Sequence, residues 1–229
     1  MNETMKEAAE VLLADRTYLY TLLHKVFGRE PDAEMLEILT SEATAEAFSL
    51  LSEEEGDVMS KVPAFLAEVK NDASKADFIE RVREEYNRLF VGPVKLVAPP
   101  WESVYRGKEA MLFQESTLEV RQAYRKYGLK TASEHRVADD SLALELDFMR
   151  HLAVRAQEAL AAGDDAAMKE ALTGSADFLR EHLLVWIPKF LDKMKDAPTD
   201  CLYPQMSLIL SELLPKDGRV VSELLGAIG

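Results

Sequence analysis

A stiff, extended segment carries side chains that are well suited to binding another chain. The run Ala-Pro-Pro-Trp-Glu-Ser-Val-Tyr occupies residues 98–105. Adjacent prolines fix φ and remove two backbone N–H donors, so this run cannot continue a helix. Trp101 and Tyr105 offer apolar surface, while Glu102 and Ser103 offer a carboxylate and a hydroxyl. This set could hold a ligand with cationic and apolar parts, although a tryptophan that only fills the core explains Trp101 equally well.

A second candidate is a carboxylate on an apolar helix face. A helix that starts near Asp139 and Asp140 places Glu145 inside an apolar arc, at about 100° per residue. A buried carboxylate needs a donor or a counter-charge. Glu145 could therefore contact a ligand, or it could form a structural ion pair or a hydrogen bond to a tyrosine. Asp139 or Asp140 could equally serve as the N-cap of this helix.

A third candidate lies on the following helix. Phe178, His182 and Trp186 recur at four-residue steps and therefore share one face, and Pro188 follows them. The proline should kink or end the helix, because it removes the hydrogen bond to residue 184. A histidine between two aromatic residues is usually a satisfied core residue, so His182 alone does not indicate a ligand.

No residue pattern in the sequence indicates catalysis. A di-iron bundle needs Glu-x-x-His on two helices, and no such motif occurs. The nucleophile elbow, the Walker loop and the dinucleotide fingerprint are also missing. Asp147 and His151 have the spacing of two metal ligands, but two ligands on a solvent face are a weak signal. We expect no enzymatic activity, no metal and no cofactor.

The charge balance excludes nucleic acid as a partner. Among 229 residues, 41 are acidic and 27 are basic, which gives a formal net charge of −14. Such a surface repels phosphate and attracts a cationic partner, although acidity also simply favours solubility. No apolar run reaches the length of about 18 residues that a membrane helix needs. The polar start of the chain and its single cysteine, Cys201, lead us to expect a cytoplasmic protein.

Helical periodicity dominates the rest of the chain. We expect a single all-α domain over residues 1–229, a bundle of about ten helices with one long Pro-rich irregular loop at 91–114. Capping-box patterns at 52–55 and 116–119 mark two helix starts, Pro63 marks another, and Gly28 and Gly128 mark two ends. The expected helices cover residues 11–27, 32–40, 42–51, 63–70, 74–90, 116–128, 140–162, 165–195, 204–214 and 220–228.

Four motifs in this order resemble the TorD/DmsD family of redox-enzyme maturation chaperones. They are Tyr-x-x-Leu-Phe-x-Gly-Pro at 86–93, the run at 98–105, Asp-Asp-Ser-Leu-Ala-Leu-Glu-Leu-x-Phe-Met at 139–149, and Glu-His-Leu-x-x-Trp-x-Pro-x-Phe at 181–190. The resemblance implies a helical cytoplasmic protein that binds the signal peptide and the apo form of a molybdenum-cofactor oxidoreductase. It also implies delayed export until the cofactor is inserted, with transient contact with the export machinery.

A twin-arginine signal peptide is cationic and then apolar, so its receptor needs carboxylates beside aromatic groups. The resemblance and the residue types together predict a peptide site at Tyr86, Phe90, Pro100, Trp101, Glu102, Ser103, Tyr105, Asp139, Asp140, Glu145, His182 and Trp186.

The chain departs from the family pattern Glu-Pro-x-Asp-His-x-x-x-Glu at two places. Val137 and Ala138 replace Glu-Pro, and Ser141 replaces the histidine. The client therefore need not be a reductase with a twin-arginine signal. The alternative from another class is a helical protein that binds a small molecule or a nucleotide in the same groove, with weak hydrolysis at most.

Overall fold

The computed structural model describes residues 3–52, 57–75, 77–93, 95–107, 111–130 and 138–228, and this part of the chain is helical without a strand. The order of elements confirms the all-α prediction. The helices are α1 (Glu3–Gly28), α2 (Ala33–Leu39), α3 (Glu42–Ser49), α4 (Val58–Ala73), α5 (Phe78–Tyr86), α6 (Glu102–Arg106), α7 (Glu115–Lys126), α8 (Leu142–Ala162), α9 (Asp165–Phe178), α10 (Leu184–Met194) and α11 (Tyr203–Ile228). Two π-helical turns, η1 (Asn87–Val91) and η2 (Leu179–Leu183), extend α5 and join α9 to α10.

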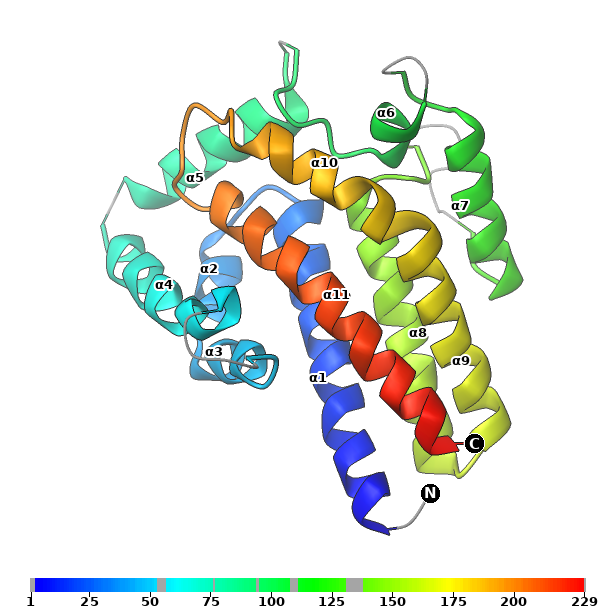
Figure 1. The fold of residues 1–229 in the computed structure, drawn as a ribbon. Coiled ribbons are helices and arrows are strands. Elements are labelled where there is room, and N and C mark those ends of the chain that lie inside the picture. Colours follow the sequence, from blue (N-terminus) through cyan, green and yellow to red (C-terminus); the bar gives the residue numbers. More distant parts are fainter. Residues whose placement is uncertain are drawn as a thin grey trace.

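Helices α1, α8, α9, α10 and α11 form the body of the molecule. Helix α1 packs on α8, α8 packs on α9, and α11 packs on α9 and α10. Helices α2 to α4 cover one side of this body, and α6 and α7 lie on the other side, next to α9 and α10 (Figure 1). The two ends of the described chain lie near each other at the foot of the bundle.

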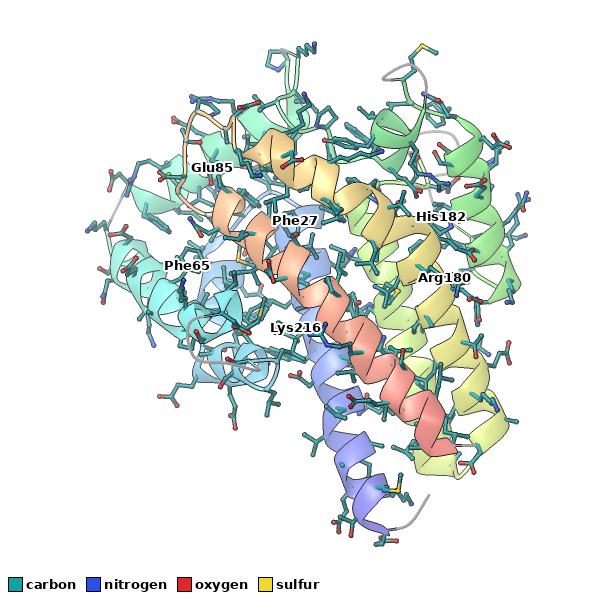
Figure 2. The ribbon with its side chains drawn as sticks, viewed as in Figure 1. Phe27, Phe65, Glu85, Arg180, His182 and Lys216 are labelled. Atoms are coloured by element: carbon teal, nitrogen blue, oxygen red, sulfur yellow. The ribbon has the colours of Figure 1, made fainter. Side chains whose placement is uncertain are left out.

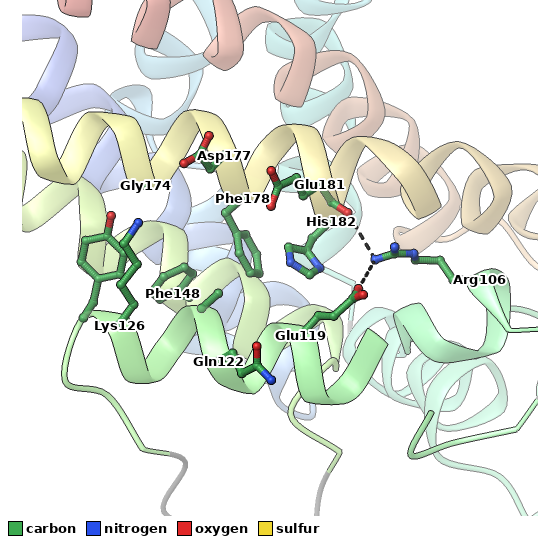
Figure 3. A pocket seen from close by; sticks show the side chains of 12 residues that line it. Arg106, Glu119, Gln122, Lys126, Phe148, Gly174, Asp177, Phe178, Glu181 and His182 are labelled. Atoms are coloured by element: carbon green, nitrogen blue, oxygen red, sulfur yellow. Dashed lines mark hydrogen bonds and ion pairs between the residues drawn. The ribbon is translucent and has the colours of Figure 1, made fainter. Parts of the chain in front are cut away.

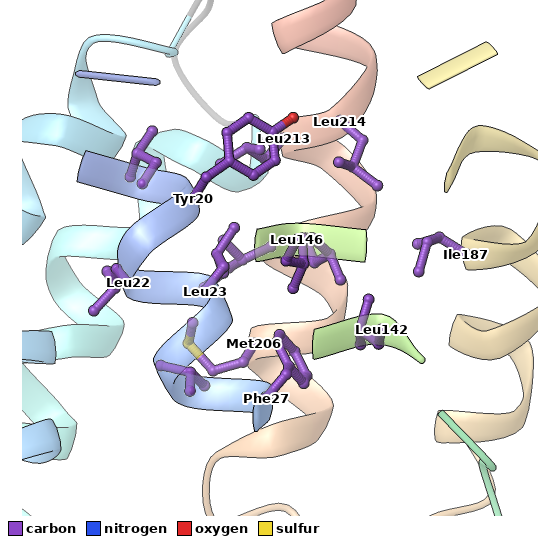
Figure 4. Close-up of a cluster of buried hydrophobic side chains, with 14 of the residues drawn as sticks. Tyr20, Leu22, Leu23, Phe27, Leu142, Leu146, Ile187, Met206, Leu213 and Leu214 are labelled. Carbon is purple, nitrogen blue, oxygen red and sulfur yellow. The ribbon is translucent and has the colours of Figure 1, made fainter. Parts of the chain in front are cut away.

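A large apolar core joins these helices. Leu23 of α1, Leu146 of α8, Ile187 of α10 and Leu213 of α11 point into it (Figure 4). All four are at most 1% exposed. Burying a side chain of this size stabilises the fold by about 1.5–3 kcal/mol. The core therefore holds α8 and the α9–α10 segment rigidly, and these are the elements that carry most of the predicted site.

The first turn of α11 is capped by a buried carboxylate from another helix. Glu85 of α5 accepts the backbone N–H groups of Cys201, Leu202 and Tyr203 at 2.8–2.9 Å. Figure 2 shows Glu85 close to the loop that leads into α11. The first N–H groups of a helix have no partner within the helix, so this carboxylate satisfies them and complements the helix dipole.

Pro63 does not start a helix, contrary to the prediction, and the break expected between 214 and 220 is absent. Helix α4 already begins at Val58, where the Asp57 carboxylate caps the Ser60 N–H at 2.9 Å, and Pro63 lies inside it. Helix α11 continues through Pro215, so the two helices expected at 204–214 and 220–228 are one.

Tertiary contacts hold α11 together across Pro215. Buried Asp217, two residues beyond the proline, accepts Arg16 Nε at 2.5 Å, Arg16 Nη2 at 3.1 Å and the Tyr20 hydroxyl at 2.7 Å. This ion pair fixes the second half of α11 on α1, which offsets the loss of one backbone hydrogen bond.

Other boundaries differ for local reasons. The segment at 91–114 is not irregular throughout, because α6 occupies its middle. Helix α7 begins at Glu115 with Gln114 as its N-cap, so the capping box expected at 116–119 is wrong, and the box at 52–55 lies mostly outside the described residues. The helix expected at 165–195 is confirmed, since α9 continues through η2 and α10 to Met194, and Pro188 does not end it. Gly128 ends α7 as predicted, with φ of 76°.

Replacing Asp217 by alanine should destabilise the protein by about 3–5 kcal/mol, because it leaves the Arg16 guanidinium buried without a counter-charge. Urea unfolding followed by circular dichroism measures this change. The matched control is Asp192→Ala, which removes an exposed ion pair with Lys195 and should leave the midpoint unchanged. Equal effects of the two substitutions would contradict this account of α11.

Candidate functional site

The 98–105 segment is attached to the residues that precede α8. The Glu102 N–H donates to the Asp140 carbonyl and the Leu142 N–H donates to the Pro100 carbonyl, both at 3.0 Å. An antiparallel bridge pairs Trp101 with Ser141. The sequence-predicted residues of these two segments therefore lie side by side, and Pro100, Trp101 and Tyr105 remain half-buried.

The two aspartates before α8 serve as internal hydrogen-bond acceptors. The Asp140 carboxylate accepts the Ser103 N–H at 2.6 Å and the Thr117 hydroxyl at 3.0 Å, so it joins α6 to α7. The Asp139 carboxylate accepts Arg121 Nε at 2.6 Å. Both aspartates are almost completely buried. Neither aspartate is the N-cap of α8, because the Ser141 hydroxyl accepts the Leu144 N–H instead.

Glu145 is fully buried and bound to a tryptophan. Its Oε2 accepts the indole N–H of Trp186 at 2.9 Å, while Oε1 has no hydrogen-bond partner among the described residues. Burial raises the pKa of the Glu145 carboxyl well above its usual range, and the nearby negative charge of Glu102 raises it further. The buried site therefore shifts this carboxyl towards its protonated form. Of the interpretations left open by the sequence, a structural hydrogen bond fits, with tryptophan as the donor.

Glu102 is fully buried, as Asp140 and Glu145 are. Its Oε1 accepts Arg106 Nη1 at 2.5 Å, and its Oε2 lies 3.0 Å from His182 Nδ1. The His182 ring stacks on Phe178 with 4.6 Å between centroids. Glu102 therefore joins α6 to the π-turn η2 and orients both partners. The Tyr105 ring, three residues along α6, stacks on Trp186 at 5.5 Å.

Tyr86 and Phe90 lie in a separate part of the core. Their rings pack on Tyr203 of α11, with centroids 5.5 Å and 5.1 Å from its ring. Phe190 connects the two groups, since its ring lies 6.4 Å from Phe90 and 5.7 Å from Trp186. The structure thus brings ten of the twelve predicted residues together, but mostly as a buried polar layer rather than as the wall of an open groove.

An open cavity of about 600 Å³ lies beside this layer, between α7 and the α9–η2 segment. We call it the α7–α9 groove (Figure 3). Of the twelve predicted residues, only His182 lines it. The lining residues are Arg106, Glu119, Gln122, Ala123, Lys126, Tyr127, Phe148, Gly174, Asp177, Phe178, Glu181 and His182.

The groove combines carboxylates with an aromatic wall. Glu119 projects from α7, and Asp177 and Glu181 project from the opposite segment, while the rings of Phe148 and Phe178 lie between them (Figure 3). These two rings meet edge to face at 4.8 Å. The arrangement can bind a ligand that is both cationic and apolar.

Gly174 leaves room for the Tyr127 ring in the wall of the groove. A Cβ atom at this position would lie 2.1 Å from the Tyr127 hydroxyl oxygen, which is too close for any side chain. The Tyr127 hydroxyl donates to the Glu170 carbonyl at 3.1 Å, so the ring cannot move away without losing this bond. A glycine in the middle of α9 is therefore a packing requirement of the groove.

Sequence reasoning missed the three groove carboxylates. Asp177 and Glu181 flank Phe178 and His182 at helical spacing, and this pattern was the available signal. Glu119 carried no comparable signal, because nothing in the sequence indicates that α7 lies opposite α9. For the described residues, no cluster of three or more His, Cys, Asp or Glu is placed to hold a metal. None of the described helices is long and apolar enough to cross a membrane.

Comparison with known proteins identifies the family. Residues 53–192, more than half of the chain, match the family described as nitrate reductase delta subunit. The chain belongs to this family.

Relatives named TorD and DmsD match over much of the chain, which confirms the predicted resemblance. The chain is 24% identical over 221 residues to chaperone protein TorD of Vibrio cholerae serotype O1, covering 96% of this chain and 98% of the relative. It is 26% identical over 223 residues to TorD of Shewanella pealeana, covering 93% of each chain. It is 27% identical over 135 residues to the probable Tat proofreading chaperone DmsD of Haemophilus influenzae, covering 59% of each chain.

Replacing Glu145 by glutamine should change how stability depends on pH. Because the folded state raises the pKa of this carboxyl, unfolding releases a proton above about pH 4.5, and the wild-type protein loses stability as pH rises. Glutamine keeps an acceptor for the Trp186 indole and has no proton to release. The free energy of unfolding of the variant should therefore rise relative to that of the wild type from pH 5 to pH 8, by at most about 1.4 kcal/mol per pH unit.

Urea unfolding of both proteins at several pH values measures the Glu145 effect. A difference in unfolding free energy that stays constant over this range would mean that Glu145 is ionised in the folded state.

Proposed function

We propose that this TorD/DmsD-family protein is a chaperone for the maturation of a molybdenum-cofactor oxidoreductase. It binds the client's signal peptide and apo form in the cytoplasm, without catalysis, aids cofactor insertion and delays export until the cofactor is in place. The observation that carries the proposal is the match to Vibrio cholerae TorD, which covers 96% of this chain and 98% of the relative.

The α7–α9 groove supports a signal peptide as the ligand. Glu119, Asp177 and Glu181 already bind guanidinium groups of this chain, Glu119 that of Arg106 and the other two that of exposed Arg180. They can bind client arginines in exchange, through charge-assisted hydrogen bonds that are about twice as strong as neutral ones. Phe148, Phe178 and Tyr127 offer a surface for the apolar part of the peptide. The formal net charge of −14 accelerates the encounter with a cationic segment.

The buried residues that the sequence predicted have a positioning role in this proposal. Glu102 orients His182 and Arg106, which line the groove, and Glu145 holds Trp186 behind them. Pro100, Trp101 and Tyr105 are half-buried and remain our candidates for direct contact with the client. Asp139, Asp140, Ser103, Tyr86 and Phe90 act through packing and internal hydrogen bonds.

A nucleotide fits the groove less well than a cationic peptide. All three lining carboxylates are already paired, Glu119 with Arg106 and both Asp177 and Glu181 with the exposed Arg180, and Arg106 also pairs with buried Glu102. With Lys126, three cations meet four carboxylates, so a phosphate group would meet a surplus of one negative charge. The groove therefore favours the chaperone hypothesis over the small-molecule alternative.

Neutralising two groove carboxylates should weaken peptide binding about tenfold. The test peptide carries two arginines followed by an apolar helix-forming stretch, and its affinity is measured by calorimetry. Glu119→Gln combined with Glu181→Gln removes two charges from the groove. Glu37→Gln combined with Glu84→Gln removes two exposed charges from α2 and α5 and should change the affinity by less than twofold.

Two results would contradict the peptide proposal. Equal affinities for both double variants would mean that the peptide binds elsewhere. Saturable nucleotide binding by a wild-type protein that does not bind the peptide would favour the small-molecule alternative.

A further inference from the structure

A guanidinium group already occupies the acidic side of the α7–α9 groove. Arg106 Nη1 lies 2.5 Å from Glu102 Oε1. It also lies 3.1 Å from Glu119 Oε2 and donates to the Glu181 carbonyl at 3.3 Å (Figure 3). One nitrogen thus serves three acceptors. Its hydrogen bonds to Glu102 and to the Glu181 carbonyl both use Nη1.

We propose that Arg106 is an internal occupant of an arginine-binding subsite, and that an arginine of the client takes its place. The subsite consists of Glu102, Glu119 and the Glu181 carbonyl. This inference rests on the proposed function, because it assigns one part of the same groove. Arg106 would then act as an autoinhibitory contact that lowers the affinity for cationic segments.

The charge balance makes such an exchange favourable. Glu102 is fully buried, so it requires a cation whether or not a client is bound. When one guanidinium replaces another, no buried carboxylate is left unpaired. The incoming group can also bond Glu102 and Glu119 through different nitrogens, whereas Arg106 reaches both through Nη1 alone.

Arg106 is placed so that it can leave the subsite. It is the last residue of the five-residue helix α6, and Gly107 follows it. Its side chain is 28% exposed and that of Glu119 is 44% exposed, so solvent reaches both. Released Arg106 can be hydrated, while Glu102 keeps its contact with His182.

The subsite should prefer arginine to lysine. Its acceptors are spread around a planar group, and the stacked rings of Phe178 and His182 line the cavity next to it. A guanidinium is planar, donates in several directions and stacks on aromatic rings, whereas an ammonium is a compact point charge.

The first experiment compares peptide affinities of Arg106→Gln and the wild type by calorimetry. The variant should bind the twin-arginine peptide about tenfold more tightly, because no internal guanidinium competes. Its affinity for a peptide with two lysines in place of the arginines should rise much less. Arg125→Gln removes an exposed charge from neighbouring α7 and should change either affinity by less than twofold. Unchanged or weaker arginine-peptide binding by folded Arg106→Gln would overturn the inference while leaving the proposed function intact.

If Arg106→Gln does not fold, a second variant tests the inference. Glu102→Gln keeps a hydrogen-bonding side chain of the same shape, and it should lose affinity for the arginine peptide more than for the lysine peptide. Equal losses for the two peptides would overturn the inference.

A small cation tests the subsite without any client. Millimolar methylguanidinium should raise the melting temperature of Arg106→Ala by several degrees, and equal methylammonium should not. Equal shifts with both cations would overturn the arginine subsite. If no variant binds any peptide but methylguanidinium restores stability, the subsite stands and the proposed function fails.

Discussion

The buried carboxylate of Glu102 organises the region around the groove. It lies on a short helix yet is completely excluded from solvent, so it must be paired. Its two partners, Arg106 and His182, come from α6 and η2, and both line the α7–α9 groove. The pairing between residues 98–105 and the start of α8 holds this helix in place. The shape and charge of the groove therefore depend on one internal ion pair.

Most of the fold could be predicted because the apolar residues recur at helical spacing almost everywhere. Two of the misplaced boundaries involve prolines, and the helices continue through both of them. The sequence predicts a helix end at residue 214, next to Pro215, but the pairing of Asp217 with Arg16 holds the chain beyond it. The two partners are about 200 positions apart in the sequence, so no local pattern could reveal this contact.

The site was predicted in part. The sequence correctly placed Glu145 in an apolar environment, since the arc of apolar residues around it is local to one helix. It could not show that Trp186 supplies the donor, because that contact joins two helices. Likewise, the carboxylates Glu119 and Glu181 face one groove only because α7 packs against the α9–η2 segment. Residue types and spacing indicate candidate groups, whereas the packing of helices decides which of them line a groove.

The central claim is that the client peptide occupies the α7–α9 groove. Hydrogen exchange followed by mass spectrometry, with and without a saturating twin-arginine peptide, tests it most directly. The account predicts slower exchange in residues 115–127 and 174–183, and no change in α2 to α4, which lie on the opposite side of the bundle. Protection confined to α2 to α4, with unchanged exchange in α7 and η2, would contradict it.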